Sequence, residues 1–289
     1  MEDIMTLNEA SLHRVPCNIC GSSKERFITT QNSCRVVECM ECGFVYVNPR
    51  PRDEKLKELY LNYLPEKIED PLQWNVYMKG VFKKAAYIIT EMFPKGGRLL
   101  DIGCGYGFFL SEMKARGWET YGMDVSSTAV SYASGRGLNV ALGTLKDITY
   151  QDDFFDAVTM FYVLEHLPDP LDALKDIRNI LKPGGLLILR LPHTTPIVRL
   201  LSFFGINNNL YDPPFHLNDF SPAATKVILE KAGFKNICTI IGGFTSPISM
   251  PVRLVTAFFG LIAEAACIMS FGKFLLPGVA KTTIAEKQR

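Results

Sequence analysis

Two patterns of hydrophobic positions follow one another along the chain, and the change between them comes near residue 96. Before it, the pattern predicts two helices, at 53–63 and 74–93. After it, short apolar runs alternate with helical segments, which specifies a parallel sheet covered by helices on both faces. The predicted strands are 98–102, 119–123, 157–161 and 186–191, and the predicted helices between them are 108–116, 127–135 and 169–181.

Three glycines stand where a sheet of this kind binds its ligands, at the carboxyl end of the first strand. Gly103, Gly105 and Gly107 open a helix, so the backbone can turn tightly and approach a ligand closely; a plain tight turn is the alternative. The spacing differs from the Gly-x-Gly-x-x-Gly of a pyrophosphate binder, and the preceding Asp101 suits a cationic ligand. Asp124 ends the second strand, where a carboxylate can bind two ribose hydroxyls.

Composition indicates one sizeable globular domain and a small additional module. The chain has 289 residues, of which 47% are hydrophobic, and its formal net charge is +1. That charge gives no overall attraction to nucleic acid. The stretch Asn48-Pro-Arg-Pro51 breaks regular structure and marks the end of the module. The predicted organisation is therefore a module at 1–50, a helical linker at 51–95 and an α/β domain at 96–289.

Four cysteines in the module have the spacing of a metal site. Cys17 and Cys20 form one Cys-x-x-Cys, Cys39 and Cys42 form another, and a glycine follows each pair. Two such turns about 20 residues apart are typical of one tetrahedral zinc, and four sulfur ligands leave no position for substrate, so the metal is expected to be structural. A pair of disulfides or ordinary buried thiols are the alternatives. Disulfides are disfavoured because residues 1–9 carry no signal-peptide pattern, which predicts a reducing, cytoplasmic setting.

With these motifs in order, the chain resembles the class I S-adenosylmethionine-dependent methyltransferases from about residue 96 to 241. The matching segments are the Asp101–Gly107 loop, Asp124, Phe155-Asp-Ala-Val158, the run 163–170 and the run 181–187. The resemblance implies a Rossmann-like sheet of seven mostly parallel strands, with 281–286 returning antiparallel beside 235–241. It also implies a cofactor site for S-adenosylmethionine. The implied cofactor residues are Asp101, Gly103, Cys104, Gly105, Tyr106 and Gly107 for the methionine part, Asp124 for the ribose with Val125 next to it in the chain, Thr144 and Leu145 with neighbouring Asp147 for the adenine, and Phe161 near the sulfonium.

Three histidines are candidates for the base that deprotonates an acceptor hydroxyl. His166 follows the strand at 157–161, His193 follows the strand at 186–191, and His216 lies in the connection after that strand. Quinone-biosynthesis O-methyltransferases hold a metal with a similar Glu-His pair and an upstream glutamate. Tyr162 occupies that upstream position here, so no second, catalytic metal is expected.

An apolar insert precedes the last predicted strand. Residues 254–272 contain one charge, Glu264, and the flanking strands require both ends of the 244–279 insert to lie at the mouth of the site. That topology argues against a membrane span. The insert is then either a buried helical cap or a surface, within 248–279, that contacts the inner face of a membrane peripherally.

The zinc module with Asn48-Pro-Arg-Pro51 resembles a subset of the family found in bacterial surface-glycan and glycolipid pathways. We therefore expect O-methylation of a hydroxyl on a small-molecule, glycan or lipid-linked glycan acceptor. A deoxysugar C-methyltransferase and a quinone or lipid O-methyltransferase are the alternatives. An RNA methyltransferase or a non-catalytic scaffold is less favoured, because the module lacks a Lys/Arg stripe and the cofactor residues are intact.

Overall fold

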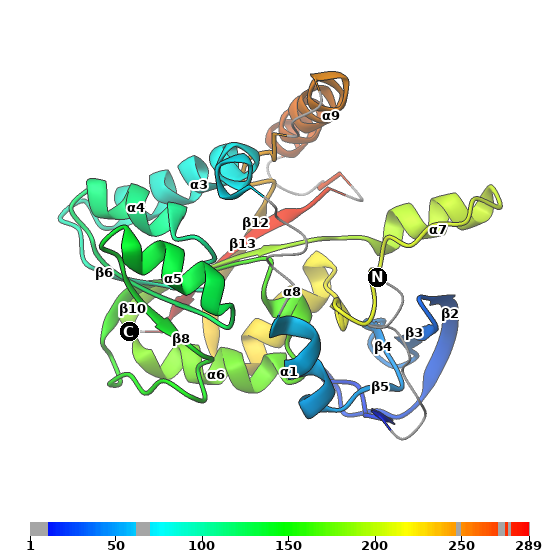
Figure 1. The fold of residues 1–289 in the computed structure, drawn as a ribbon. Helices are drawn as coiled ribbons and strands as arrows, with labels where there is room; N and C mark the ends of the chain where they lie inside the picture. The colour runs from blue at the N-terminus through cyan, green and yellow to red at the C-terminus, as the bar shows by residue number, and fades with distance from the viewer. Residues whose placement is uncertain (1–10, 62–69, 247–249, 271–274, 277–278, 289) are drawn as a thin grey trace.

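The central element is a seven-stranded sheet in the order β12-β13-β10-β9-β6-β7-β8 (Figure 1). The structure is a computed structural model that describes residues 11–61, 70–246, 250–270, 275–276 and 279–288. All neighbouring strands are parallel except at β13, which is antiparallel to both β10 and β12. The strands are β6 (Arg98–Ile102), β7 (Glu119–Asp124), β8 (Asn139–Leu142), β9 (Phe155–Phe161), β10 (Leu181–Leu191), β12 (Phe234–Ile240) and β13 (Lys281–Lys287).

This topology confirms the predicted Rossmann-like fold with an antiparallel last strand. The sequence did not predict β8, whose four residues lie at the sheet edge and are all partly or fully exposed, so no buried apolar run marks them.

Helices cover both faces of the sheet, and alternate positions along each strand pack against different helices. On β6, Leu99 belongs to the apolar cluster formed with α3, α4 and α5. The next residue, Leu100, belongs to the cluster formed with α6 and α8 on the opposite face. Figure 1 shows α3 and α4 on one side of the sheet and α6 on the other. These helices are α3 (Pro71–Met92), α4 (Phe108–Ala115), α5 (Ser127–Gly135), α6 (Pro170–Ile180) and α8 (Pro222–Lys231).

The cysteine module is built into the body of the molecule through a shared sheet. Its strands β2 (Glu25–Gln31), β3 (Cys34–Cys39) and β4 (Val45–Val47) are joined by β11 (Asn218–Asp219), which comes from the connection after β10. The two-residue strands β1 (Leu12–His13) and β5 (Arg50–Pro51) pair separately. Phe44 packs against Phe220 with ring centroids 5.1 Å apart. The sheet therefore crosses the boundary that the sequence places at residue 50.

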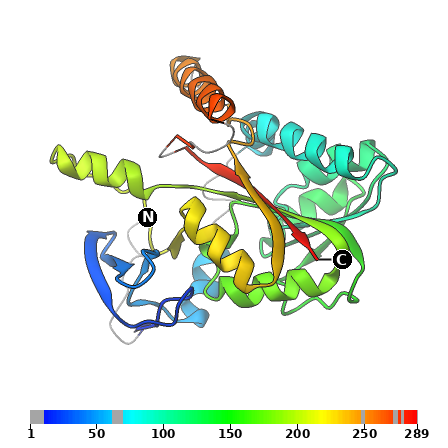
Figure 2. The same cartoon turned by 180° about the vertical axis from the view of Figure 1, so that it is seen from behind.

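Two further helices project from the carboxyl edge of the sheet. Helix α7 (Thr195–Phe203) follows β10, and α9 (Met250–Met269) follows β12. Since β13 is antiparallel to both β10 and β12, these two strands run in the same direction and end at the same edge. Figures 1 and 2 show both helices extending outward from the body. Helix α1 (Asp53–Leu61) lies near the module. Among the described residues, no helix combines the length and apolarity needed to cross a membrane.

A buried arginine joins β10 to the chain segment that leads to α9. Arg190 is only 2% exposed, and its guanidinium donates to the carbonyl oxygens of Ile241 and Gly243 and to the hydroxyls of Thr282 and Tyr162. Five fixed donors make a guanidinium suited to such a convergent set of acceptors.

We expect Arg190→Met to lower the free energy of unfolding by about 2–4 kcal/mol, because it leaves buried acceptors without donors. Urea denaturation measures the change. Arg116→Met, which removes an exposed helical ion pair with Glu112, serves as the control and should change stability by about 0.5 kcal/mol or less. Equal effects of the two substitutions would contradict the structural role given to Arg190.

Candidate functional site

A cavity of about 1470 Å³ lies at the carboxyl ends of the parallel strands. Its wall includes Gly103 after β6, Asp124 at the end of β7, Phe161 at the end of β9 and His193 after β10. This is the edge at which open α/β sheets bind their ligands. The residues that the sequence singles out at strand ends therefore meet in one place.

The glycine loop needs its glycines for backbone conformation and for space. Gly103 has a φ of 71°, and a Cβ there would lie 2.3 Å from Cγ2 of Val163. Gly107, with a φ of 73°, is the N-cap of α4. L-residues with side chains rarely adopt this left-handed region.

Asp124 holds the loop in place through backbone hydrogen bonds. One carboxylate oxygen accepts from the Gly105 N–H at 2.8 Å, and the other accepts from the Ser126 N–H at 2.9 Å. Burial raises the pKa of Asp124 above its usual range, and the backbone N–H donors oppose that shift. Each oxygen still has a lone pair that can accept from a ligand hydroxyl.

Asp101 lies beneath the same loop. It is 2% exposed, accepts a hydrogen bond from the Thr159 hydroxyl at 2.6 Å and does not belong to the cavity wall. Burial raises the pKa of Asp101 to about 7, and the nearby Asp124 adds to the shift. A cationic group bound above the loop would lower this pKa and favour the ionised carboxylate.

The other predicted cofactor residues divide into two groups by position. Those that line the cavity are Gly103, Gly105, Asp124, Val125, Thr144, Leu145 and Phe161. Those that lie in or under the loop without lining the cavity are Asp101, Cys104, Tyr106 and Gly107. Asp147 accepts hydrogen bonds from the backbone N–H and the hydroxyl of Thr144, at 2.9 and 2.7 Å, and so fixes the loop after β8.

All three candidate histidines line the cavity, but their neighbours differ. The rings of His166 and His216 have centroids 4.8 Å apart. Nδ1 of His166 lies 3.0 Å from the carbonyl oxygen of Phe215 and 3.3 Å from the hydroxyl of Tyr60. Nδ1 of His193 instead lies 2.9 Å from Nζ of Lys281. Lys281 was not predicted from the sequence as a site residue, because it is far from His193 along the chain and no motif connects the two residues.

A buried glutamate lies beside the first two histidines. Glu165 is fully buried, and among the described residues neither of its carboxylate oxygens has a hydrogen-bond partner. Burial raises the pKa of Glu165 to about 8, so it is neutral at pH 7 unless a cation lies near it. Single ligand atoms of Glu165, His166 and His216 lie within 4.8 Å of one another, a donor set that a divalent cation could use. Tyr162, in the position of the upstream glutamate, accepts from Arg190 instead.

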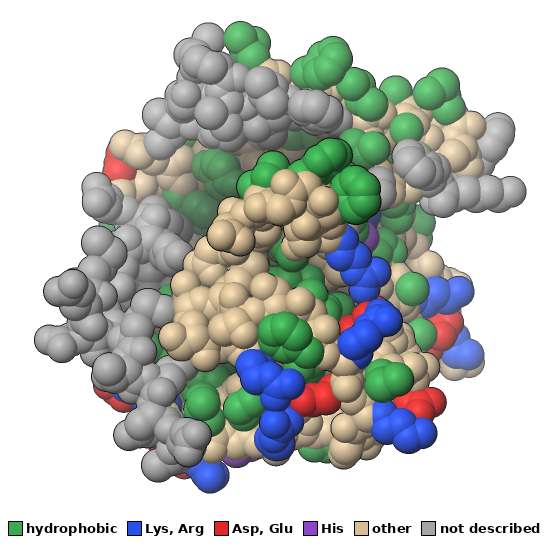
Figure 3. All heavy atoms as spheres, turned by 90° about the vertical axis from the view of Figure 1, so that its right-hand side faces the viewer, with side chains coloured by type: hydrophobic (Ala, Val, Ile, Leu, Met, Phe, Trp, Pro, Cys, Tyr) green, Lys and Arg blue, Asp and Glu red, His purple; other side chains and the backbone are tan. Residues whose placement is uncertain are grey.

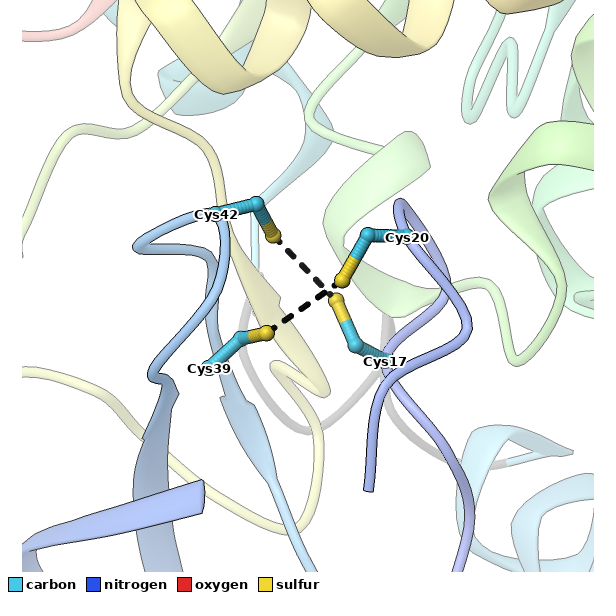
Figure 4. Close-up of side chains that lie close together, drawn as sticks. All are labelled: Cys17, Cys20, Cys39 and Cys42. Carbon is cyan, nitrogen blue, oxygen red and sulfur yellow. Dashed lines mark hydrogen bonds between the residues drawn. The ribbon is translucent and has the colours of Figure 1, made fainter. Parts of the chain in front are cut away.

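The four predicted zinc ligands converge at one end of the module (Figure 4). Sγ of Cys17 lies 3.5 Å from Sγ of Cys42, and Sγ of Cys20 lies 3.4 Å from Sγ of Cys39. A disulfide would require about 2.05 Å. Zinc with four Zn–S bonds of about 2.3 Å places its sulfurs about 3.8 Å apart, so the cluster fits a zinc ion. The glycines after each pair donate their N–H groups to the carbonyl oxygens of Cys17 and Cys39 and so close the two turns.

Comparisons with known proteins identify the family of the chain. The family model described as a methyltransferase domain matches residues 77–239, more than half of the chain. A relative from Xanthomonas axonopodis pv. citri, named ubiquinone biosynthesis O-methyltransferase, is 32% identical over 160 residues, which cover 52% of this chain and 67% of that protein. A protein of the same name from Alkalilimnicola ehrlichii is 34% identical over 118 residues, 38% of this chain and 48% of that protein.

Solved structures share the fold. A SAM-dependent methyltransferase from Thermotoga maritima gives a TM-score of 0.52 at 19% identity, over 79% of this chain and 100% of that one. Phosphoethanolamine N-methyltransferase 2 of Haemonchus contortus, in complex with S-adenosyl-L-methionine, gives 0.51 at 16% identity, over 80% and 60%. The chain therefore belongs to the methyltransferase domain family and is a class I S-adenosylmethionine-dependent methyltransferase.

Proposed function

We propose that the enzyme transfers a methyl group from S-adenosylmethionine to a hydroxyl of an amphiphilic acceptor, such as a lipid-linked glycan or glycolipid precursor. The observation that carries this proposal is an exposed apolar surface beside the cavity, on α7 and α9. Ile197 of α7 and the nearby Leu210 both line the cavity and are partly exposed, so the surface is continuous with the site.

Helix α7 and the turn after it expose large apolar side chains. Phe203 is 82% exposed and Phe204 65% exposed. Leu200 and Ile206 are also more than half exposed. Figure 3 shows hydrophobic side chains in the upper part of this face, with Lys and Arg side chains interspersed with Asp and Glu below them. An apolar edge above a charged, polar region suits the interface of a lipid bilayer.

Helix α9 presents a second apolar face and does not cover the cavity. Its small residues Ala263 and Cys267 are buried against Ile241, whereas no described residue of α9 lines the cavity. The opposite face exposes Leu254, Phe258, Leu261, Ile262 and Met269. This arrangement favours contact with lipid over the buried cap that the sequence allowed. We therefore place the enzyme peripherally at the inner face of a membrane, through residues within 248–279 and the end of α7.

In this proposal the cofactor lies along the glycine loop. Asp124 and Val125 bind the ribose, Thr144 and Leu145 flank the adenine, and the aromatic face of Phe161 lies near the sulfonium, where its quadrupole favours a cation. Asp101, Cys104, Tyr106 and Gly107 support the loop from below or from its end. Methyl transfer then requires alignment of donor and acceptor and removal of one hydroxyl proton.

A second candidate is O-methylation of a lipid quinone precursor. It is favoured by the relatives named ubiquinone biosynthesis O-methyltransferases and by the same apolar surface. Both candidates share a hydroxyl acceptor that is delivered from lipid. The third possibility, a deoxysugar C-methyltransferase, gives no role to that surface if its acceptor is water-soluble.

The apolar surface is tested by vesicle flotation. We expect the protein to float with phosphatidylethanolamine/phosphatidylglycerol vesicles. The double substitution Phe203→Ser/Phe204→Ser should reduce the bound fraction by about tenfold or more, since it removes two exposed phenylalanines that would insert into the lipid. Phe27→Ser, at an exposed aromatic residue of β2, is the matched control and should bind as the parent protein does. Labelled methyl groups from S-adenosylmethionine should then enter the lipid extract of the source cells. A parent protein that stays in the soluble fraction would refute the proposed acceptor class.

We propose further that residues 1–50 form a zinc ribbon, 51–95 a helical linker and 96–289 the methyltransferase domain, with one structural Zn²⁺ on Cys17, Cys20, Cys39 and Cys42. Asn18 and Arg50 both donate to the carbonyl oxygen of Pro168, at 2.8 and 2.7 Å, so the ribbon supports the loop that carries His166.

Elemental analysis should find one zinc per chain. The Cys39→Ser variant should contain no zinc and should melt several degrees lower, because the metal supplies folding free energy to the ribbon. Cys238→Ser, which changes an exposed cysteine of β12, should keep both. Full zinc content in Cys39→Ser would exclude the four-cysteine site.

A further inference from the structure

A buried lysine contacts one of the three cavity histidines. His193 follows β10 and Lys281 begins β13, and the antiparallel register pairs Lys281 with Leu191. Nζ of Lys281 lies 2.9 Å from Nδ1 of His193. The lysine is 4% exposed, whereas the histidine lines the cavity. With Nδ1 directed to the lysine, Nε2 is the ring nitrogen left to face an acceptor.

The contacts of Lys281 fit both of its protonation states. Nζ also lies 3.1 Å from the carbonyl oxygen of Leu276 and 2.7 Å from that of Val279. An ammonium group donates to both carbonyls and to Nδ1 of His193. A neutral amine donates to the same two carbonyls and accepts from an Nδ1–H. The three contacts therefore persist when a proton moves between the two side chains.

Burial and the charges around the pair lower the pKa of the lysine. Burial and the nearby Arg190 lower the pKa of Lys281 to about 8, and Asp219 opposes that shift. Burial and Lys281 lower the pKa of His193 to about 4, and Asp219 again acts in the other direction. Asp219 is itself held by the N–H groups of Thr194 and Thr195 and by the Thr195 hydroxyl. Near neutral pH the imidazole is therefore neutral, and the proton belongs to the lysine.

We infer that His193 is the base that takes the acceptor proton, and that Lys281 is its positioning partner and receives the displaced ring proton. This inference rests on the proposed hydroxyl acceptor. The acceptor O–H proton moves to Nε2 of His193, and the Nδ1 proton moves to the neutral Lys281 amine. The acceptor oxygen bonds to the methyl carbon while the carbon–sulfur bond breaks. The electron pair of the broken bond stays on sulfur, so the sulfonium becomes a neutral thioether. The lysine ammonium then releases its proton to solvent.

His166 differs in the group that its inner nitrogen meets. Nδ1 of His166 lies 3.0 Å from the carbonyl oxygen of Phe215, which accepts a hydrogen bond but does not take up a proton. His166→Asn is therefore the natural comparison for His193→Asn, because both rings line the same cavity.

The first test needs no acceptor. The chain has four histidines, so nitrogen-labelled imidazole spectra can be assigned with His193→Asn. Between about pH 6 and about pH 10 we expect His193 to change from the Nε2–H to the Nδ1–H tautomer with a midpoint near 8, as Lys281 loses its proton. Lys281→Met should abolish this change, and Lys281→Arg, which keeps a permanent cation, should hold the Nε2–H form throughout. A single His193 tautomer across this range in the parent protein would overturn the inference.

The second test uses the acceptor found in the lipid extract. His193→Asn should lower kcat by about 100-fold or more while the dissociation constant of S-adenosylmethionine stays within about twofold. The parent rate should rise with pH through about 8, and Lys281→Met should move that midpoint down by at least about one pH unit, a shift that loss of packing alone would not produce. Full activity in His193→Asn, with loss in His166→Asn, would assign the base to His166 instead. Since the tautomer change is measured without any acceptor, it distinguishes a failure of this inference from a failure of the proposed substrate class.

Discussion

The glycine loop at the carboxyl edge of the sheet depends on two buried carboxyl groups. Asp124 holds the glycine loop through the Gly105 and Ser126 N–H groups, and Asp101 lies under the loop against Thr159. Burial raises both pKa values, so each carboxylate gains from a ligand that brings positive charge or hydroxyl donors. In the proposed cofactor site, a sulfonium with an adjoining amino acid and a ribose would supply both, so electrostatics as well as shape would favour the cofactor there.

The part of the cavity that we propose for the acceptor is assembled from segments that are distant in sequence. The cysteine module contributes Asn18 and Arg50, which both bind the Pro168 carbonyl oxygen after His166. The connection after β10 contributes β11 to the module sheet and carries His216 next to it. The last strand contributes Lys281 to His193. A different part of the chain therefore lies beside each histidine of the cavity. The buried carboxyl group of Glu165 lies close to His166 and His216, and its ionised form would need a nearby cation.

The sequence was sufficient for features that depend on local pattern. The strands β6, β7 and β9, the convergence of the four cysteines and the antiparallel last strand all follow from residue spacing or from family resemblance, and the structure agrees. It was insufficient where the decisive partner comes from far along the chain. Nothing near His193 indicates Lys281, and nothing in residues 1–50 indicates that β11 completes their sheet. Edge strand β8 was missed because it lacks a buried apolar run.

Calorimetric titration with S-adenosylmethionine and S-adenosylhomocysteine tests most directly whether the carboxyl edge is the cofactor site. We predict micromolar binding of S-adenosylmethionine, and affinity at least about tenfold weaker in Asp124→Ala, because a buried hydrogen-bonding carboxylate is lost. Asp152→Ala, at an exposed position just before β9 and therefore at the opposite edge of the sheet, should bind as the parent protein does. Absence of binding to either compound, or equal affinity in Asp124→Ala, would contradict the account.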